Sequence, residues 1–101
     1  MIAYLSGPMT GLPDNGYPAF QAAAERLRSQ GVQVISPHEI TPPGAGPWSW
    51  EAHMRVDLAA LLTADVIVML PGWEGSRGAR LEKAVAEALG LVVDYSLTGT
   101  S

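Results

Sequence analysis

The stretch "DVIVMLPGWEGSRGARLEKAVAEALGLVVDY", from Asp65 to Tyr95, decides the fold class of this sequence. "DVIVML" is a continuous apolar run, which is typical of a parallel strand buried on both faces. A glycine-containing loop and a helix follow it, and "LVVDY" is a second strand. Strands that alternate with helices predict a parallel sheet with right-handed crossovers. The helix is expected to bury an apolar stripe, which consists of Leu81, Ala84, Val85, Ala88 and Leu89.

The same alternation extends back to the start of the chain. "MIAYL" and "VQVIS" are predicted strands, and the helix between them has Pro18 in its first turn and ends at Gly31. Another helix is predicted from about Trp50 to Thr63. The order βαβαβαβ predicts a three-layer α/β/α fold with a flavodoxin-like or Rossmann-like parallel sheet of about four strands. The apolar faces expected for these two helices are Tyr17, Phe20, Ala24 and Leu27, and then Met54, Leu58, Leu61 and Leu62.

The composition limits the possible functions. The chain has 101 residues, which suits a single domain over residues 1–101, and 48% of them are hydrophobic, enough for a core. The net charge of -4 argues against a nucleic acid as the partner. Because the chain has no cysteine, neither disulfides nor a thiolate metal site is possible.

The whole chain also predicts where the protein is located and whether it self-associates. The first residues, "MIAYLSGPMTG", lack the basic leader of a signal peptide, and no apolar run is long enough to cross a bilayer. We therefore expect a cytoplasmic protein with no membrane partner. A core this small gains from self-association, and with the three tryptophans this predicts a homodimer or a larger homo-oligomer. The last residues, "SLTGTS", are expected to fray.

Three loops follow predicted strands: Ser6 to Gly16, Pro37 to Ser49, and Pro71 to Arg77. The carboxyl ends of parallel strands meet at one edge of the sheet, and ligands of such folds bind there. The second loop is long for a connection, which is typical of a lid or a binding loop. We expect the functional site where these loops meet.

Glu82 is the first candidate for chemistry. It lies one turn inside its helix, and its neighbours three and four positions away, Gly78, Ala79, Val85 and Ala86, cannot pair with a carboxylate. Glu87, in contrast, has Lys83 four positions before it and is predicted to form a surface pair. An accessible, unpaired and ionised carboxylate near a helix N-terminus can act as a nucleophile. A solvated helix acid is an equally weighted alternative.

The loop "GWEGSRG" before Glu82 is a second candidate. Its glycines let backbone N–H groups approach an anion at the helix N-terminus. Ser76 is expected to cap the helix or to bind a phosphate oxygen, and Arg77 and Arg80 add positive charge. The alternative is an ordinary strand-to-helix turn. The Walker pattern is absent from this loop. "SGPMTG" does not match GxGxxG, and no acidic residue ends the second strand to hold a ribose, so a nicotinamide cofactor is disfavoured and no cofactor is predicted.

Two aspartates receive different interpretations. Asp57 lies mid-helix among apolar neighbours, with only His53 as a possible partner, and the residue pattern alone favours the edge of a solvated face. Asp65 opens its strand at the opposite end of the sheet, which predicts a structural cap. His38 and His53 lack a third ligand at a suitable spacing, so no metal site is predicted, and each histidine is expected to bond or to lie at the surface.

The three tryptophans lie in or beside the loops of the expected site. Trp48, Trp50 and Trp73 are candidates for stacking on a planar base. A dimer contact, or a lid that packs on the core, is an equally plausible use of these side chains.

The segments "MIAYLSGPMTG", "YPAFQAAAERLRSQGVQVISPHE", "MRVDLAALLTADVIVMLPGW" and "SRGARLEKAVAEALGL" together resemble the nucleoside 2-deoxyribosyltransferase-like proteins. The similarity covers nearly the whole chain and points to a branch common in bacteria and phages. Characterised members are nucleoside deoxyribosyltransferases and deoxynucleoside 5'-monophosphate N-glycosidases. The resemblance implies a flavodoxin-like or Rossmann-like sheet and a small-molecule nucleoside or nucleotide as the partner.

The resemblance also implies roles for individual residues. Glu82 matches the catalytic glutamate, Tyr4 a tyrosine near the sugar, and Asp57 an aspartate that assists proton transfer or holds the sugar. Ser76 matches a serine that binds the 5'-phosphate in the nucleotide hydrolases. Three residues match the first-strand loop that lines the same pocket: Ser6, Gly7 and Gly11.

The implied reaction is cleavage or transfer at an N-glycosidic bond through a covalent glycosyl-glutamate. Glu82 would attack the anomeric carbon, Asp57 would assist departure of the base, and Ser76 with Arg77 would anchor the 5' end. A non-catalytic nucleotide-binding module with the same pocket is the alternative, favoured by a first loop without the arginine of phosphate-specific members. A structural domain without pocket chemistry has the least support.

Overall fold

Four short strands form one parallel sheet in the computed structural model, which describes residues 1–40 and 49–98. The strand order is β2-β1-β3-β4. The predicted parallel sheet is therefore confirmed. Strand β2 is added on one side of β1, and β3 and β4 are added on the other, as in a flavodoxin-like sheet. The strands are β1 (Ile2–Ser6), β2 (Gln33–Ile35), β3 (Val66–Met69) and β4 (Val92–Asp94).

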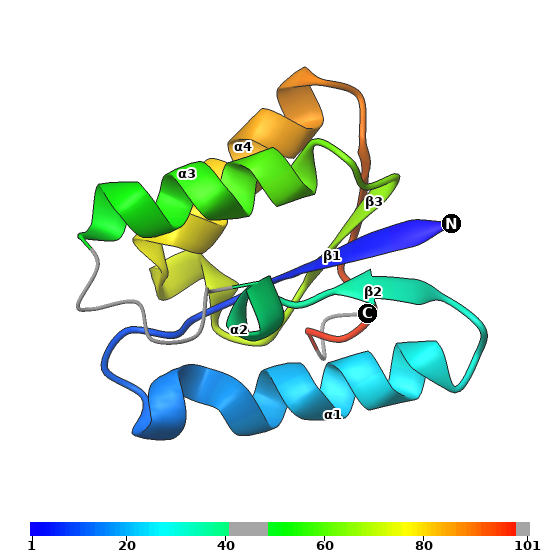
Figure 1. Cartoon of the computed structure of the whole chain (residues 1–101), viewed down its shortest axis with the longest axis horizontal. Helices are drawn as coiled ribbons and strands as arrows, with labels where there is room; N and C mark the ends of the chain where they lie inside the picture. Colours follow the sequence, from blue (N-terminus) through cyan, green and yellow to red (C-terminus); the bar gives the residue numbers. More distant parts are fainter. Residues whose placement is uncertain (41–48, 99–101) are drawn as a thin grey trace.

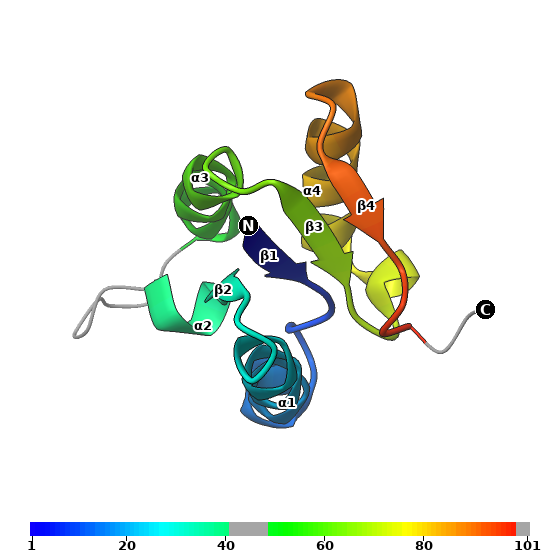
Figure 2. The same cartoon turned by 90° about the vertical axis from the view of Figure 1, so that its right-hand side faces the viewer.

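The helices cover both faces of this sheet, which confirms the three-layer architecture. Helix α1 (Tyr17–Arg28) lies on one face, whereas α3 (Trp50–Leu61) and α4 (Arg77–Ala88) lie side by side on the other (Figures 1 and 2). Three short elements complete the described chain: α2 (Pro37–Ile40) and the 3-10 helices η1 (Pro13–Gly16) and η2 (Trp73–Gly75).

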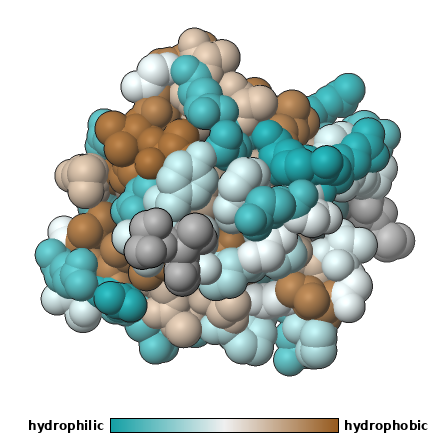
Figure 3. Space-filling view, turned by 180° about the vertical axis from the view of Figure 1, so that it is seen from behind, coloured by the Kyte–Doolittle hydropathy of each residue, from teal (hydrophilic) through white to brown (hydrophobic). Residues whose placement is uncertain are grey.

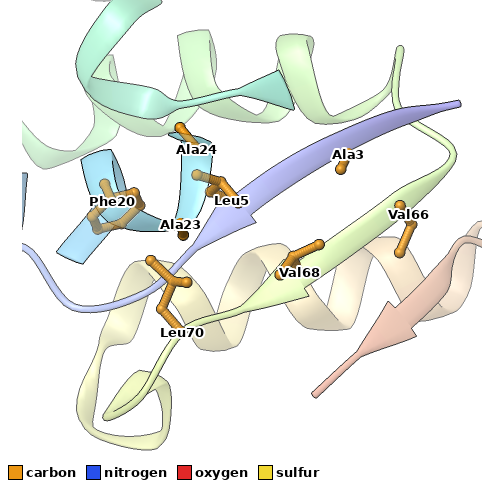
Figure 4. Packing of buried hydrophobic residues seen from close by; sticks show 8 residues of the cluster. All are labelled: Ala3, Leu5, Phe20, Ala23, Ala24, Val66, Val68 and Leu70. Atoms are coloured by element: carbon orange, nitrogen blue, oxygen red, sulfur yellow. The ribbon is translucent and has the colours of Figure 1, made fainter. Parts of the chain in front are cut away.

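On the α1 face, alternate residues of β1 and β3 form a continuous apolar layer. Phe20, Ala23 and Ala24 pack on this layer from the helix (Figure 4). Removing one such large side chain from water stabilises a fold by roughly 1.5–3 kcal/mol. The eight buried residues of the cluster are Ala3, Leu5, Phe20, Ala23, Ala24, Val66, Val68 and Leu70.

On the other face, the side chains of β1 are not all apolar. Successive residues of a strand point to opposite faces, so Tyr4 and Ser6 face α3 and α4 while Leu5 faces α1. Tyr4 pairs in register with Ile67, and Ser6 pairs with Met69. Both polar side chains are fully buried, which requires hydrogen-bond partners on this face.

The phase of α4 differs from the predicted stripe. Its buried residues are Ala79, Glu82 and Ala86, whereas Ala84 and Leu89 are exposed. Val85, from the predicted stripe, packs against the core as a partly buried residue, but the residues that face the sheet directly lie on a neighbouring stripe that the prediction left out. Consequently the buried face of α4 carries an acid.

Two glycines allow close approaches near the carboxyl edge. A Cβ on Gly7 would lie 2.7 Å from Leu70 Cβ, so only glycine lets the end of β1 run against the end of β3. A Cβ on Gly16 would lie 2.5 Å from the Pro8 carbonyl oxygen, and this residue has a φ of 76°. These contacts hold the end of β1 against Leu70 and bring η1 against the start of the loop that follows β1.

Asp65 is confirmed as a structural cap. Its Oδ2 accepts a 2.8 Å hydrogen bond from the Ile2 N–H, and its own N–H donates to the Ile2 carbonyl. The predicted surface pair is also present, with 3.0 Å between Lys83 Nζ and Glu87 Oε1. The Asp65 interaction lies at the end of the sheet away from the carboxyl edge, and the Lys83–Glu87 pair lies on the exposed side of α4.

Several local expectations need correction. The predicted loop from Pro37 begins with α2, and residues 41–48 lie outside the described part. Tyr17 and Leu62, expected in apolar faces, are exposed. Within the tail expected to fray, residues 96–98 form a turn in which Leu97 packs on the α1-face core, and residues 99–101 are not described.

Hydrophobic surface is not evenly spread on the outside. Seen from behind, the largest hydrophobic areas lie on the left side, and smaller ones lie near the top and at the lower right between hydrophilic residues (Figure 3). Among the described residues, the large exposed apolar ones are Met1, Leu12, Tyr17, Leu62, Leu89, Val92 and Tyr95. In the described ranges, no helix has both the length and the apolar character needed to cross a bilayer.

Candidate active site

The side chain of Glu82 lies between α4 and the sheet and is held by two hydroxyl groups. Only 4% of its surface is exposed. The Tyr4 hydroxyl donates to Oε2 at 2.5 Å, and the Ser6 hydroxyl donates to Oε1 at 2.7 Å. The expectation of an accessible, unpaired acid was therefore wrong. Its partners come from β1, 76 and 78 positions away in the chain, where no helical spacing could reveal them.

Burial dominates the protonation behaviour of this acid. It raises the pKa of Glu82 to about 7, although the hydrogen bonds from Tyr4 and Ser6 lower it, and the charge of Asp57 raises it further. Burial, with the negative charge of Glu82, also raises the pKa of Tyr4, so this phenol keeps its proton and remains a donor. The carboxyl group thus titrates near neutral pH rather than being ionised throughout that range, as the helix-dipole argument had implied.

Asp57 reaches the same region from α3. It is 8% exposed, so its interpretation as the edge of a solvated face was wrong. Burial raises the pKa of Asp57 to about 6. Within residues 1–40 and 49–98, no hydrogen bond engages its carboxyl group. The two acids are close enough for the charge on Asp57 to raise the pKa of Glu82.

Both carboxyl groups line a cavity of about 660 Å³ at the carboxyl edge of the sheet. This size lies within the range of small-molecule sites. The loop after β1, the start of α2, helix α3 and the start of α4 all contribute to its walls. The site lies above β1, where the strand order reverses, which is where parallel α/β sheets bind ligands.

The predicted site residues occupy three kinds of position. Five line the cavity: Gly7, Asp57, Ser76, Arg77 and Glu82. Tyr4 and Ser6 lie behind Glu82 and bind its carboxyl group. Gly11 and Trp73 are not among the lining residues.

Ser76 and Arg77 form the wall at the start of α4. The Ser76 hydroxyl accepts a 3.2 Å hydrogen bond from the Ala79 N–H, so it caps the helix, one of the two roles expected for it. The Arg77 guanidinium lies 3.7 Å from the centroid of the Trp50 ring, a cation–π contact that joins α4 to α3. The cap and the guanidinium together make this end of the cavity attractive to an anion.

The tryptophans that were candidates for base stacking lie in different places. Trp50 lines the cavity, whereas Trp73 packs beside Tyr95, with ring centroids 5.9 Å apart, and near Lys83. Trp48 lies outside the described residues. Stacking of Trp73 on a ligand in this cavity therefore has no geometric support, because η2 turns its ring toward the last strand.

Several lining residues, among them His53 and Met54, were not assigned to the site from sequence. Together with the candidates Trp50 and Asp57 they recur at positions i, i+3, i+4 and i+7 of α3, and this helical spacing could have shown that all four share a face. Asn15, Phe20 and Pro37 also line the cavity, but they come from separate elements. In the described ranges, no three acidic or histidine side chains are grouped to hold a metal ion.

The fold is similar to that of two solved enzymes. A 2-deoxyribosyltransferase from the psychrotolerant bacterium Bacillus psychrosaccharolyticus superimposes with a TM-score of 0.78 and 26% identity, over 100% of this chain and 76% of that one. A 2-deoxyribosyltransferase from Leishmania mexicana gives 0.70 and 20% identity, over 91% of this chain and 61% of that one. The resemblance drawn from the sequence is thereby confirmed.

Sequence comparison gives a second, coarser result. No curated protein matches the chain. One family model, described as a domain of unknown function and called DUF4406, matches residues 1–95. The chain therefore belongs to the DUF4406 family, and its structure is similar to those of 2-deoxyribosyltransferases.

Proposed function

We propose that this protein cleaves or transfers the N-glycosidic bond of nucleosides or nucleoside 5'-monophosphates. The observation that carries the proposal is a buried glutamate, Glu82, held by Tyr4 and Ser6 in the wall of a cavity that also contains Asp57. The similarity to a 2-deoxyribosyltransferase at 26% identity supports nucleoside glycosyl transfer as the reaction class.

In the first step, the ionised Glu82 attacks the anomeric carbon of the sugar. A C–O bond forms to a carboxylate oxygen while the C–N bond to the base breaks, and the base leaves with that electron pair. Asp57, in its protonated form, donates a proton to the departing base. The sugar carries positive charge in the transition state, which both carboxyl groups stabilise.

In the second step, water or an acceptor base attacks the same carbon. Asp57, now ionised, accepts the proton of the incoming group, and the bond between the sugar and Glu82 breaks. The hydroxyls of Tyr4 and Ser6 hold the carboxyl group in one orientation during both steps. Arg77 and the N-terminus of α4 bind the 5' end of the substrate.

The raised pKa values place both acids near neutrality, and their order limits the reactive form. Asp57, with a pKa of about 6, can both give and accept a proton close to neutral pH. Glu82, with a pKa of about 7, must lose its proton before it can attack. Because Asp57 has the lower pKa, the form with Glu82 ionised and Asp57 protonated is a minor one, and we expect the rate of the first step to peak between about pH 6 and 7.

The test is incubation with a panel of nucleosides, deoxynucleosides and their 5'-monophosphates, with base release followed by chromatography. Wild type should release base, and Glu82→Ala should be inactive. Glu87→Ala, an exposed residue of the same helix, is the matched control and should retain activity. Equal activity of wild type and Glu82→Ala would exclude Glu82 as the nucleophile. Thermal stabilisation by a nucleotide without any product would instead favour the nucleotide-binding module.

A further inference from the structure

The turn at Asp14, Asn15 and Gly16 has an unusual backbone. Three consecutive residues are left-handed, with φ values of 52°, 53° and 76°. L-residues other than glycine enter this region at a cost, although asparagine and aspartate tolerate it best. Such conformations persist where the surrounding structure holds them, and they occur often at functional sites.

His38 contacts this turn from α2, which follows the neighbouring strand β2. Its Nε2 lies 2.9 Å from the Asn15 carbonyl oxygen, and because a carbonyl only accepts, Nε2 carries the proton. The His38 ring is itself fixed by edge contacts with Phe20 and Tyr17, at centroid distances of 4.7 and 5.5 Å. The Asn15 N–H donates to the Leu12 carbonyl at 3.0 Å. Both backbone groups of Asn15 are therefore anchored.

Asn15 lines the cavity, whereas its left-handed neighbour Asp14 does not. Among residues 1–40 and 49–98, no hydrogen bond engages the Asn15 side-chain amide. An amide offers donors and an acceptor together. A strained but anchored backbone thus presents a free amide at the wall of the cavity.

The order of the strands indicates which part of a ligand Asn15 would meet. Asn15 follows β1 but bonds to His38, which follows β2, so it lies on the β2 side of the edge, whereas Ser76 and Arg77 follow β3. Glu82 contacts the side chains of β1, between these two sides. With the 5' end of a nucleoside at Arg77 and its anomeric carbon at Glu82, the base would extend toward Asn15.

We propose that Asn15 recognises the base of the substrate and that His38 is its positioning residue. This inference rests on the proposed function. A side-chain amide matches the edge of a nucleobase, where donors and acceptors lie side by side. Asn15 thereby contributes to the choice of base, a step separate from the chemistry at Glu82.

The test uses variants that keep the left-handed turn. Asn15→Gly removes the amide but suits the backbone, and we expect about a tenfold loss of kcat/KM, as for one lost hydrogen bond. Asp14→Gly makes the same backbone change next to the cavity and should remain within about twofold of wild type, as expected for a surface substitution. If both glycine variants match wild type on every base, Asn15 has only a backbone role and the proposal is overturned.

Asn15→Asp tests the recognition itself, because an ionised carboxylate only accepts hydrogen bonds. Nucleosides of hypoxanthine and thymine, which present carbonyl acceptors, should lose more activity than those of adenine and cytosine, which present amino donors. Equal losses on all four bases would contradict base recognition by Asn15.

His38 is tested through a substitution pair. His38→Phe removes the donor to the Asn15 carbonyl and should raise KM with little change in kcat, while His38→Gln restores an N–H donor and should recover most of the affinity. Adding His38→Phe to Asn15→Gly should cause no further rise in KM, since both act through one amide. Additive effects would overturn the positioning role.

Failure of the proposed function is distinguishable from failure of this inference. If wild type binds nucleosides but releases no base, the reaction is wrong, and calorimetric dissociation constants for the same variants still measure recognition by Asn15. The same base-dependent pattern in those constants supports the inference, and its absence overturns it. If wild type binds no member of the panel, both proposals fall.

Discussion

Glu82 and Asp57 are both buried acids in one cavity wall, yet they are held differently. Glu82 accepts hydrogen bonds from Tyr4 and Ser6 on the rigid first strand, whereas Asp57 has no hydrogen bond to its carboxyl group within the described residues. The first arrangement fixes an oxygen in space, which suits attack on carbon. The second leaves a carboxyl group free to meet a substrate proton. Similar burial thus supports two separate roles.

After the inactivation expected for Glu82→Ala, the largest effect is that of Asp57→Asn. Loss of the proton carrier should lower kcat by about 10³-fold, in the range found for general acid–base groups. Because the charge of Asp57 raises the pKa of Glu82, the variant should also lower the pKa of Glu82. Steady-state rates measure the first effect, and an NMR titration of the Glu82 carboxyl group measures the second. An unchanged rate would remove Asp57 from the reaction.

The next effect concerns stability. The fold raises the pKa of Glu82 from 4.5 to about 7, so the folded state binds this proton more tightly than the unfolded chain. This favourable contribution is complete below the unfolded pKa and is lost as the pH rises toward 7, a change on the order of 3 kcal/mol in the free energy of unfolding.

Glu82→Gln should remove much of this pH dependence, leaving the smaller contribution of Asp57, which has the same sign. Urea unfolding at pH 5 and pH 8 gives the comparison, and Glu87→Gln is the control because that side chain is exposed. A fall in stability from pH 5 to pH 8 that is equal in wild type and in Glu82→Gln would contradict the raised pKa of this acid.

Tyr4→Phe should produce a smaller loss of activity, about 10²-fold in kcat, because the orienting hydroxyl is removed while the ring still fills its site. The hydrogen bond from Tyr4 lowers the pKa of Glu82, so its loss should raise that pKa in the same NMR titration, opposite to Asp57→Asn. Ser6→Ala should shift the pKa in the same direction with a smaller loss of activity, about tenfold. Shifts of the same sign in Asp57→Asn and Tyr4→Phe would contradict this account.

The smallest expected effect is that of Asp65→Ala, which removes an acid at the opposite end of the sheet. Its hydrogen bond to the Ile2 N–H should contribute about 1 kcal/mol to stability, with no change in kcat or in the pH profile. Thermal unfolding and the base-release assay together check this. A pH profile altered by Asp65→Ala would mean that long-range charge, rather than local contact, controls the two site acids.

Much of the architecture was predictable because it depends on local patterns. "DVIVML" is apolar throughout and became β3, buried on both faces. Asp65 at its start could be assigned a cap because its place at one end of the sheet follows from strand direction alone. The phase of α4 was not predictable in this way, since its buried face is defined by small residues and one acid.

The sequence by itself determined the order of strands and helices, the edge where the loops meet, and the identity of Glu82 as a helix acid without a local partner. Tertiary structure decided that Tyr4 and Ser6 supply its hydrogen bonds, that Asp57 is buried, and that Trp73 faces away from the cavity. The physical reason is that periodicity reports which neighbours share a face along one element. Contacts between residues far apart in the chain, and the burial that shifts their pKa values, exist only after the elements pack.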